Sequence, residues 1–223
     1  MKFDTSIVQT RFQSPLGTII IAATHRGLAG LWFEGQRHLP PELLTPTLGT
    51  DVSSLPPEGA LRLRPGPSAG SGQAKAGSAA PAGGEKDPTP VASRRTATWP
   101  SDPDHPVLKE VMQQLTAYFA GQRSRFDVPL DLAHGTAFQQ SVWQALLDIP
   151  QGGTASYGEV GRRIGKPAAV RAVGAAVGRN PVSIIVPCHR VMGANGALTG
   201  YAGGLDRKTA LLKLEGVLQE HRP

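Results

Sequence analysis

Val-Ser-Ile-Ile-Val-Pro-Cys-His-Arg, residues 182–190, contains the only cysteine among the 223 residues of the chain. The first five of these residues are mostly β-branched, so we expect a short strand to lead into the tetrad Pro187-Cys188-His189-Arg190. A thiol beside an imidazole, in a chain with no second cysteine, favours a nucleophile over a disulfide bridge or a cysteine-rich zinc site. The chemistry of this chain is therefore expected at Cys188.

The Cys188-His189 pair has two interpretations on the residues alone. A free thiol has a pKa of about 8.5, so only a few per cent is thiolate at neutral pH and a nucleophile needs a neighbouring base. His189 can take the proton directly or through one water, and Glu215 is a candidate carboxylate to orient the ring. The alternative is that Cys188 is a small buried hydrophobic residue, as lone cysteines often are.

The positive charge of the chain is concentrated with the cysteine. The net charge is +6: residues 1–104 hold 10 basic and 9 acidic residues, and residues 105–223 hold 13 and 8. A basic surface attracts polyanions, of which nucleic acid is the commonest. A lone cysteine fits a reducing compartment, and the apolar run of residues 19–23 is too short to cross a bilayer. We therefore expect a protein of the cytoplasm without membrane contact.

The N-terminal residues predict short strands, and a helix follows much further along the chain. Strands are expected at residues 7–12, 17–23 and 28–33. Asp104 is the expected N-cap of the helix, with Pro106 in its first turn and Gly121 at its end. Apolar residues recur at helical spacing and predict a stripe that faces the core: Val107, Leu108, Val111, Met112, Leu115, Tyr118 and Phe119.

The stretch between these strands and this helix has a different composition. Residues 40–103 hold 12 of the 20 prolines, with runs of Gly, Ala and Ser. Such a segment buries too little apolar surface to offset the entropy of ordering it, so we predict a disordered insertion over residues 39–104. The alternative is a segment that binds a partner through Arg94, Arg95 and Trp99.

The rest of the chain predicts four helices. They are expected from Thr136 to Ile149, from Ser156 to Ile164, from Pro167 to about Arg179 and from Leu205 to Glu215. Ser156-Tyr157-Gly158-Glu159 is a capping-box pattern that opens the second of them, and Gly165 closes it. Two short helices joined by a glycine-containing turn suggest a helix-turn-helix.

The second helix of that pair consists almost wholly of small residues. They are Ala168, Ala169, Ala172, Gly174, Ala175, Ala176 and Gly178. One interpretation is close packing against a neighbouring helix, with Arg171 in solvent. The other is a helix that lies against the narrow minor groove of DNA, with Arg171 inserted where a base has left the stack.

Beyond the tetrad, a long series of motifs resembles the O6-alkylguanine-DNA alkyltransferase family. The matching motifs are Gly135-Thr136-Ala137-Phe138-Gln139, Val142-Trp143, Ile149-Pro150, Ser156-Tyr157-Gly158, Arg171-Ala172-Val173-Gly174, Asn180-Pro181, residues 185–191, Gly200-Tyr201-Ala202-Gly203-Gly204, Lys208, Leu211-Leu212 and Glu215-Gly216. The resemblance covers residues 105–216, and the strands of residues 1–38 are similar to the family's N-terminal domain. It implies an α+β fold with a small ribonuclease-H-like α/β N-terminal domain (1–38 and 105–131). A helical C-terminal domain (132–219) would carry a winged-helix-like helix-turn-helix.

The resemblance also implies the catalytic residues. Cys188 would accept the alkyl group, His189 would act as the base through a water, and Glu215 would orient the imidazole. Asn180 would hold the turn before the active-site strand by hydrogen bonding. Tyr157 would rotate a phosphate and help to protonate the departing guanine, and Lys208 would support it.

Two further sets of residues follow from the same resemblance. Those implied in DNA binding are Arg171, Ala172, Gly174, Tyr157 and Arg179, with Arg171 replacing the extruded nucleotide in the stack. Those implied in the pocket for the flipped base are Val191, Tyr201, Ala202 and Gly203.

The implied activity is that of a methylated-DNA–[protein]-cysteine S-methyltransferase, which repairs DNA by direct reversal. The alkyl group of O6-alkylguanine would pass irreversibly to Cys188, once per molecule, and O4-alkylthymine stays open as a second substrate. The implied partner is double-stranded DNA, approached from the minor groove with the damaged base flipped out. The resemblance implies a monomer with no cofactor. No metal is expected, because the chain lacks the N-terminal cysteines through which some family members bind zinc.

Three other functions stay open beside this one. An alkyltransferase-like protein binds the lesion without transfer, but such proteins lack the acceptor cysteine that this chain keeps. A helix-turn-helix regulator would carry Cys188 incidentally. A thiol hydrolase would turn over repeatedly, whereas a stable thioether limits an alkyl acceptor to one turnover.

Overall fold

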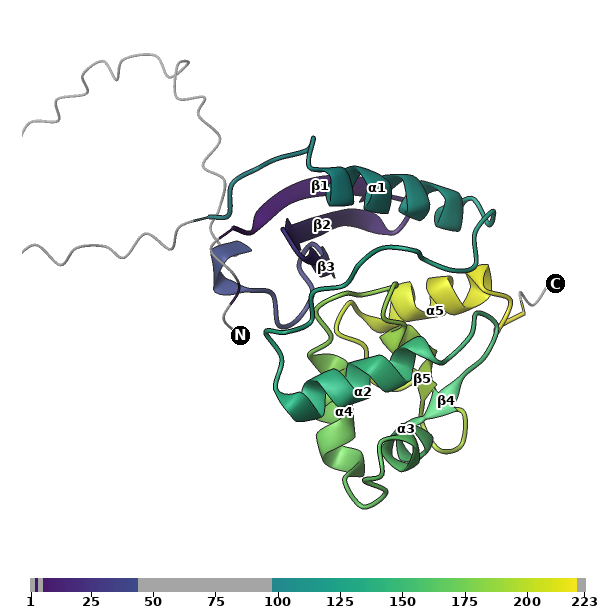
Figure 1. Ribbon diagram of the computed structural model, residues 1–223. Helices are drawn as coiled ribbons and strands as arrows, with labels where there is room; N and C mark the ends of the chain where they lie inside the picture. The colour runs from purple at the N-terminus through teal and green to yellow at the C-terminus, as the bar shows by residue number, and fades with distance from the viewer. Residues whose placement is uncertain (1–2, 4–5, 44–97, 220–223) are drawn as a thin grey trace, which may run out of the picture. The chain divides into compact units, whose positions relative to one another are not determined.

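Three antiparallel strands form a sheet near the N-terminus (Figure 1). The computed structural model describes residue 3, residues 6–43 and residues 98–219. The strands are β1 (Val8–Ser14), β2 (Gly17–Thr24) and β3 (Gly27–Phe33), in the order β1-β2-β3. The three predicted strands are therefore confirmed, although β1 extends to Ser14.

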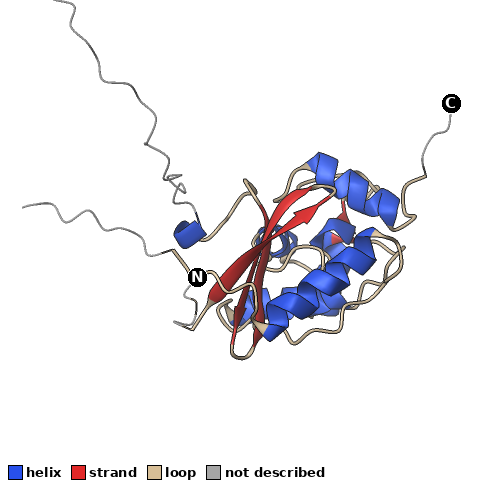
Figure 2. Cartoon of the chain, turned by 90° about the horizontal axis from the view of Figure 1, so that it is seen from above, coloured by secondary structure: helices blue, strands red, loops and turns tan. Residues whose placement is uncertain are grey.

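The sheet is buried on both faces. Alternate residues of its strands point to opposite sides, and the side chains on each side pack in a hydrophobic cluster. Ile19, Ile21 and Leu31 belong to the main hydrophobic core together with apolar residues of α1 (Pro106–Phe119), which packs across the sheet (Figure 2). Trp32 and Trp99 belong to a second cluster. The sheet therefore forms a layer between α1 and this second cluster.

The start of α1 differs from the prediction by one residue. His105, not Asp104, is the N-cap, and no side chain caps this end of the helix. Asp104 instead forms an ion pair with Lys109, whose Nζ lies 2.8 Å from Oδ1. Pro106 does occupy the first turn, as its fixed φ angle predicts.

Most of the predicted insertion, including Arg94 and Arg95, lies outside the described residues. Its two ends, which the structure does describe, make regular contacts. Pro41–Leu43 form a short 3-10 helix, η1, and Gln9 of β1 exchanges backbone hydrogen bonds of 2.9 and 3.0 Å with residues 100–102. Trp99 is 8% exposed and packs in the second cluster. Composition did not reveal these contacts, because they depend on an edge strand that is distant in sequence.

Three helices of the C-terminal half lie together below the sheet in Figure 1: α2 (Ala137–Leu147), α3 (Tyr157–Arg163) and α4 (Val170–Gly178). Thr136 and Ser156 cap α2 and α3 through complete capping boxes with Gln139 and Glu159. These bonds satisfy backbone amides that have no partner within the helix. The predicted capping box of α3 is therefore confirmed.

The turn between α3 and α4 gives the predicted helix-turn-helix. Gly165 has a φ of +68°, a left-handed conformation that glycine adopts without strain. α4 begins at Val170 rather than at Pro167, because the residues after Pro167 form a turn first. The indole of Trp143 donates to the carbonyl of Ala176 at 2.9 Å and ties α2 to α4.

The prediction of a strand over residues 182–186 is wrong. Within the described residues, Val182 alone of this run pairs with a strand, through an isolated bridge to Leu31. Ile184 has a φ of +70°, which a β-branched residue rarely adopts, so the chain turns sharply here. The turn leads into a 3-10 helix, η2 (Cys188–Arg190), rather than along an extended active-site strand.

The last elements close the C-terminal half. β5 (Val191–Met192) pairs in parallel with β4 (Ala155–Ser156), and α5 (Leu205–Leu214) follows. Glu215 is the C-cap of α5. The described residues pack as one unit, so the boundaries given above for two domains stay a prediction.

Candidate active site

Cys188 lies at the start of η2 and is only 4% exposed. The side-chain amide of Asn180 donates to Sγ over 3.0 Å. Burial raises the pKa of the thiol to about 11, although the Asn180 hydrogen bond and the charge of Lys208 oppose the rise. The thiol is therefore protonated at neutral pH, and it becomes a nucleophile only when a base removes its proton.

Asn180 braces the turn that carries the cysteine. Its Nδ2 donates to the carbonyl oxygens of Val186 at 2.7 Å and Val182 at 3.3 Å, and its Oδ1 accepts the amide of Val182 at 3.0 Å. Bonds at both ends of the turn stabilise the strained conformation of Ile184 between them. The side chain therefore fixes both the path of residues 182–186 and the sulfur.

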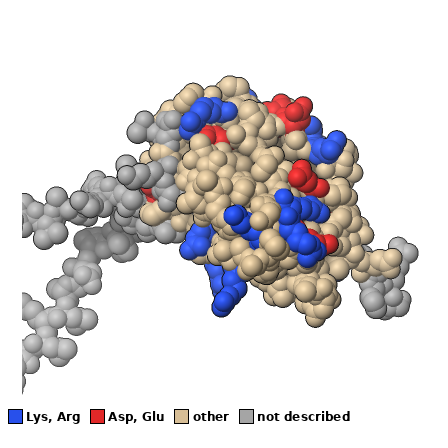
Figure 3. Space-filling view, turned by 60° about the horizontal axis from the view of Figure 1, so that its bottom comes forward, with Lys and Arg blue, Asp and Glu red and all other residues tan. Residues whose placement is uncertain are grey.

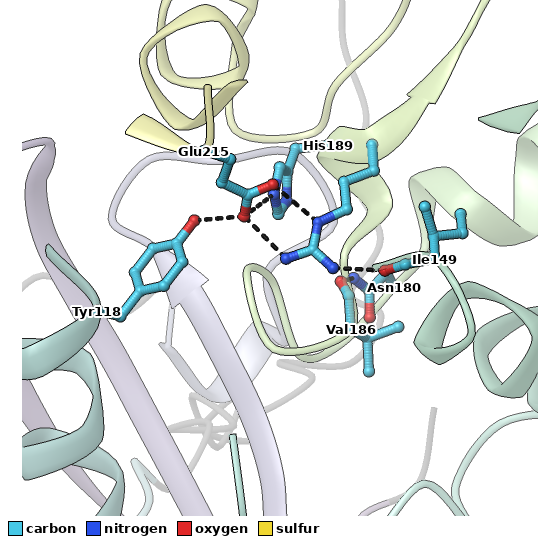
Figure 4. A network of polar contacts seen from close by, with 7 residues as sticks. Tyr118, Ile149, Asn180, Val186, His189 and Glu215 are labelled. Atoms are coloured by element: carbon cyan, nitrogen blue, oxygen red, sulfur yellow. Dashed lines mark hydrogen bonds and ion pairs between the residues drawn. The ribbon is translucent and has the colours of Figure 1, made fainter. Parts of the chain in front are cut away.

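The carboxylate of Glu215 gathers three buried side chains (Figure 4). Its Oε1 accepts from His189 Nε2 at 3.0 Å, from Arg190 at 2.8 Å and from the hydroxyl of Tyr118 at 2.7 Å. Its Oε2 accepts from Arg190 Nε at 2.8 Å, so the arginine binds both oxygens. Arg190 also donates to the carbonyl of Ile149. The network anchors η2 to the ends of α2 and α5.

The protonation states of this network follow from its bonds. Burial raises the pKa of Glu215, but the hydrogen bonds and charges of His189 and Arg190 outweigh it and bring the pKa to about 2. Burial lowers the pKa of His189 more than Glu215 raises it, so the ring is neutral at pH 7. Because an ionised carboxylate only accepts, Nε2 carries the proton and Nδ1 is the basic nitrogen. Nδ1 is buried and bonds to no described residue.

Lys208 places a positive charge near the sulfur of Cys188. Its Nζ donates to the carbonyls of Val191 at 2.6 Å and Thr199 at 2.7 Å. Burial lowers the pKa of Lys208 to about 8, and the charge of Cys188 acts in the opposite direction. The ammonium is therefore mostly charged at neutral pH, and its field favours the thiolate over the thiol.

A cavity of about 140 Å³ opens beside the cysteine. It is lined by Arg37, His38, Tyr157, Gly174, Val177, Gly178, Cys188, Gly200, Tyr201 and Ala202. This volume is well below the ~300–1,000 Å³ of drug-sized pockets and suits one small flat ring system. A second cavity of about 710 Å³ is larger, but Cys188 does not line it.

The residues predicted for the base pocket fall into two groups. Tyr201 and Ala202 line the cavity. Val191 and Gly203 do not: Val191 is fully buried, and a Cβ on Gly203 would lie 2.7 Å from the ring of Tyr201. The missing side chain of Gly203 therefore leaves room for the tyrosine ring.

The residues predicted for DNA binding also divide. Tyr157 and Gly174 line the cavity, and Arg171 and Ala172 lie exposed on α4. Arg179 is exposed but borders a different cavity of about 330 Å³, which His38 also lines. Figure 3 looks onto the end of the molecule that carries the helix-turn-helix, and Lys and Arg side chains are spread over it. Residues 157–180 hold five basic residues and one acidic residue.

Sequence reasoning missed four side chains at this site. Arg37 and His38 line the cavity from the loop after β3, and the Arg37 amide donates to the carbonyl of Ala202 at 3.0 Å. The helical stripe predicts only that Tyr118 lies in the core, and the tetrad predicts no separate role for Arg190. Nothing in the local sequence marks Arg37, His38 or Tyr118, because their partners lie far along the chain. Arg190 could have been suspected, since a charged residue between buried segments needs a counter-charge.

Two absences hold for the part of the chain that the structure describes. No group of three or more His, Cys, Asp or Glu side chains in residues 6–43 and 98–219 is arranged to hold a metal ion. Among the described helices, none combines the length and the apolar character needed to cross a bilayer.

Fold and site together define a class: a protein with a buried cysteine, next to a histidine in sequence, in the wall of a small cavity beside a helix-turn-helix. The family model described as 6-O-methylguanine DNA methyltransferase, DNA binding domain, matches residues 137–217. The model described as 6-O-methylguanine DNA methyltransferase, ribonuclease-like domain, matches residues 80–132. The chain belongs to the 6-O-methylguanine DNA methyltransferase family, which confirms the resemblance and the predicted α+β fold.

Individual relatives agree with this assignment. The methylated-DNA–protein-cysteine methyltransferase of Mycobacterium tuberculosis (strain H37Rv) is 61% identical over 113 residues, which cover 51% of this chain and 68% of that protein. The crystal structure of the M. tuberculosis O6-methylguanine methyltransferase matches with a TM-score of 0.65 at 36% identity, covering 97% and 96% of the two chains. A crystal structure of M. tuberculosis OGT in complex with DNA matches with a TM-score of 0.61 at 38% identity, covering 94% and 91%.

Proposed function

We propose that this chain repairs O6-alkylguanine in double-stranded DNA by transferring the alkyl group to Sγ of Cys188. The observation that carries this proposal is the cavity itself. It has the size of one base, the cysteine lies in its wall, and the small-residue helix α4 contributes Gly174, Val177 and Gly178 to its lining. A relative of known structure was crystallised with DNA, which supports DNA as the partner.

The reaction begins with a proton transfer. The Cys188 proton passes through a water to Nδ1 of His189, the nitrogen left basic by the Nε2 bond to Glu215. The imidazolium that forms is stabilised by the ionised Glu215, as in other acid–base pairs oriented by a carboxylate. Asn180 and Lys208 stabilise the thiolate, by hydrogen bonding to Sγ and by charge respectively.

The alkyl transfer is a single displacement. The thiolate forms a bond to the alkyl carbon as the bond from that carbon to O6 breaks, and the electron pair stays on guanine. A proton supplied to guanine makes it a better leaving group, and we assign this role to Tyr157, which lines the cavity. Lys208 would support Tyr157 through its charge, since both of its hydrogen bonds in this structure go to backbone carbonyls.

The helix-turn-helix would present the base to this cavity. A base inside a duplex is out of reach of the thiol, so the damaged nucleotide must be flipped out. Exposed Arg171 on α4 would fill its place in the stack, and the small exposed Ala172 allows close approach to the minor groove. The basic residues around α3 and α4 would bind phosphates without reading sequence.

The product fixes the stoichiometry. A thioether on Cys188 is stable, and the described residues that line the cavity include no second thiol to which the alkyl group could pass. We therefore propose one transfer per molecule by a monomer, in a reducing compartment such as the cytoplasm, where a lone thiol stays free.

A duplex oligonucleotide with a labelled methyl group at O6 of one guanine tests this function. Wild-type protein is expected to accept one label per molecule, and Cys188→Ala is expected to bind the duplex without accepting any. Label in the Cys188→Ala protein would contradict the proposed acceptor. Tight binding by the wild type without transfer would instead identify a lesion-binding protein.

A further inference from the structure

The carboxylate that orients His189 has a third buried donor, which comes from the opposite half of the chain. We propose that Tyr118 of α1 is a positioning residue that sets the basicity of His189 through Glu215. This inference rests on the proposed function, because it gives His189 the role of base. It makes the proton affinity of His189 depend on a residue that lies outside residues 182–216.

The geometry of the carboxylate is unequal at its two oxygens (Figure 4). Oε2 accepts one hydrogen bond, from Arg190 Nε. Oε1 accepts three, from Tyr118, His189 and Arg190, at 2.7, 3.0 and 2.8 Å. The shortest of the three comes from Tyr118, which is 1% exposed. The hydroxyl and the imidazole therefore bond to the same oxygen.

Three donors on one carboxylate oxygen compete with one another. Such an oxygen has about two lone-pair sites, so each added donor weakens the bonds to the others. The Tyr118 hydroxyl withdraws part of the negative charge that would otherwise stabilise a protonated His189. It therefore lowers the affinity of the imidazole for a proton.

The tyrosine is suited to act as a fixed donor. Burial and the negative charge of Glu215 raise its pKa far above the usual value, so the hydroxyl keeps its proton at every pH of interest. Its ring packs against Phe119 and Phe126, at centroid distances of 5.4 and 5.3 Å. This packing holds the ring in place, with its hydroxyl 2.7 Å from Glu215 Oε1.

The other charged and titratable groups around His189 and Glu215 stay in place when this hydroxyl is removed. They are Arg190, Lys208, Tyr201 and Cys188. Arg190 and Lys208 act on the pair through hydrogen bonds or charge, Tyr201 is coupled to Glu215 by charge, and Cys188 precedes His189 in the chain. Replacement of Tyr118 by Phe deletes one oxygen and keeps the ring. A change in the proton affinity of His189 in that variant can then be attributed to the lost donor.

The test is the pH dependence of alkyl transfer in Tyr118→Phe. Transfer needs neutral His189, so its rate falls on the acid side with the pKa of that ring. We expect the acid limb to move about 0.5–1 pH unit upward in the variant, the shift that one net hydrogen bond corresponds to.

Thr24→Val is the matched control. Thr24 Oγ1 donates to Asp131 Oδ2 at 2.7 Å, which is also a buried hydroxyl–carboxylate bond, but it lies outside the network around Glu215. This variant is expected to lose stability, as Tyr118→Phe does, and to keep the wild-type pH profile. A shift in Tyr118→Phe that Thr24→Val reproduces would reduce the effect to lost stability and overturn the proposal.

NMR titration of the His189 ring gives a second measurement that needs no activity. The pKa of His189 is expected to be higher in Tyr118→Phe than in wild type, and equal values would overturn the proposal. In the wild type, a slowly exchanging Tyr118 hydroxyl proton with a cross-peak to the His189 ring is expected even if the variant does not fold; its absence would overturn the proposed contact. Failure of the wild type to accept a methyl group would instead overturn the proposed function.

Discussion

Nδ2 of Asn180 lies 3.0 Å from Sγ of Cys188 and 2.7 Å from the carbonyl oxygen of Val186. One amide thus bonds to the sulfur of Cys188 and to the chain two residues before it. The turn of residues 182–186 includes Ile184 in a left-handed conformation, which needs bonds from other residues to persist. Reactivity of the sulfur and stability of the turn therefore depend on the same side chain.

The Asn180→Ala variant is expected to lose both stability of the turn and reactivity of the sulfur. It leaves the amide of Val182 and the carbonyl of Val186 without the side-chain bonds that they have now, which destabilises the fold by about 2–4 kcal/mol. Transfer is expected to fall by more than the folded fraction does, because Sγ loses its donor. Chemical unfolding and single-turnover transfer measure the two effects. The control is Asn195→Ala, at an exposed turn, where we expect little change in either; equal effects in the two variants would contradict this account.

The raised pKa of Cys188 predicts slow reaction with small alkylating reagents at neutral pH. Burial brings the pKa to about 11, so the thiolate fraction is very small at pH 7 and grows until the pH passes this value. We expect the iodoacetamide rate of the folded protein to rise up to about pH 11, whereas the denatured protein levels off near pH 9. A folded-state rate that levels off below pH 8 would show that the thiol is already ionised.

Glu215 predicts acid sensitivity. Its pKa is about 2 in the folded protein against 4.5 for the ordinary group, so the folded state keeps the carboxylate ionised where the unfolded state binds a proton. This stabilisation is present above pH 4.5 and is lost as the pH falls toward 2, by about 3 kcal/mol in total. Unfolding free energy measured against pH tests it. Glu215→Gln is expected to flatten the slope in this window, whereas Glu34→Gln, which removes an exposed ion pair with Arg11, should not.

Gly203→Ala is expected to disturb the cavity by displacing Tyr201. A methyl group there would lie 2.7 Å from the ring of Tyr201 and 3.2 Å from Phe33, so the tyrosine, which lines the cavity, must move. We expect slower transfer and a loss of about 1–3 kcal/mol, the usual effect of overpacking. Gly158→Ala is the control, because a Cβ inside α3 meets no atom closer than 3.8 Å and alanine favours a helix. Comparable transfer by the two variants would show that Tyr201 does not shape the site.

Local signals in the sequence predicted the elements whose bonds are local. Ser156 and Glu159 cap α3 within one turn, and Gly165 ends it. The same reasoning predicted a strand over residues 182–186, and that prediction is wrong. The conformation of this run is set by Asn180 and by hydrogen bonds to Leu31 rather than by its own composition. β-branched residues favour strands, but tertiary bonds overrode that preference here.

The candidate site also divides into residues that the sequence indicated and residues that only the fold brings to the site. The resemblance named Asn180, His189 and Glu215. The structure bonds Asn180 to Cys188 and, in a separate set of contacts, bonds His189 and Arg190 to Glu215. The resemblance did not name Tyr118, which lies 97 residues from Glu215 in sequence, because an apolar stripe on a helix predicts burial and not the partner of a hydroxyl. Arg37 and His38 reach the cavity only because β3 places their loop beside Ala202.

The decisive measurement is intact mass followed by peptide mapping, after incubation with an O6-methylguanine duplex. Each active molecule is expected to gain the mass of a single methylene unit, and the gain is expected to map to the peptide with Cys188. Unmodified protein beside repaired DNA, or a methyl group on any other residue, would contradict the proposed transfer to Cys188.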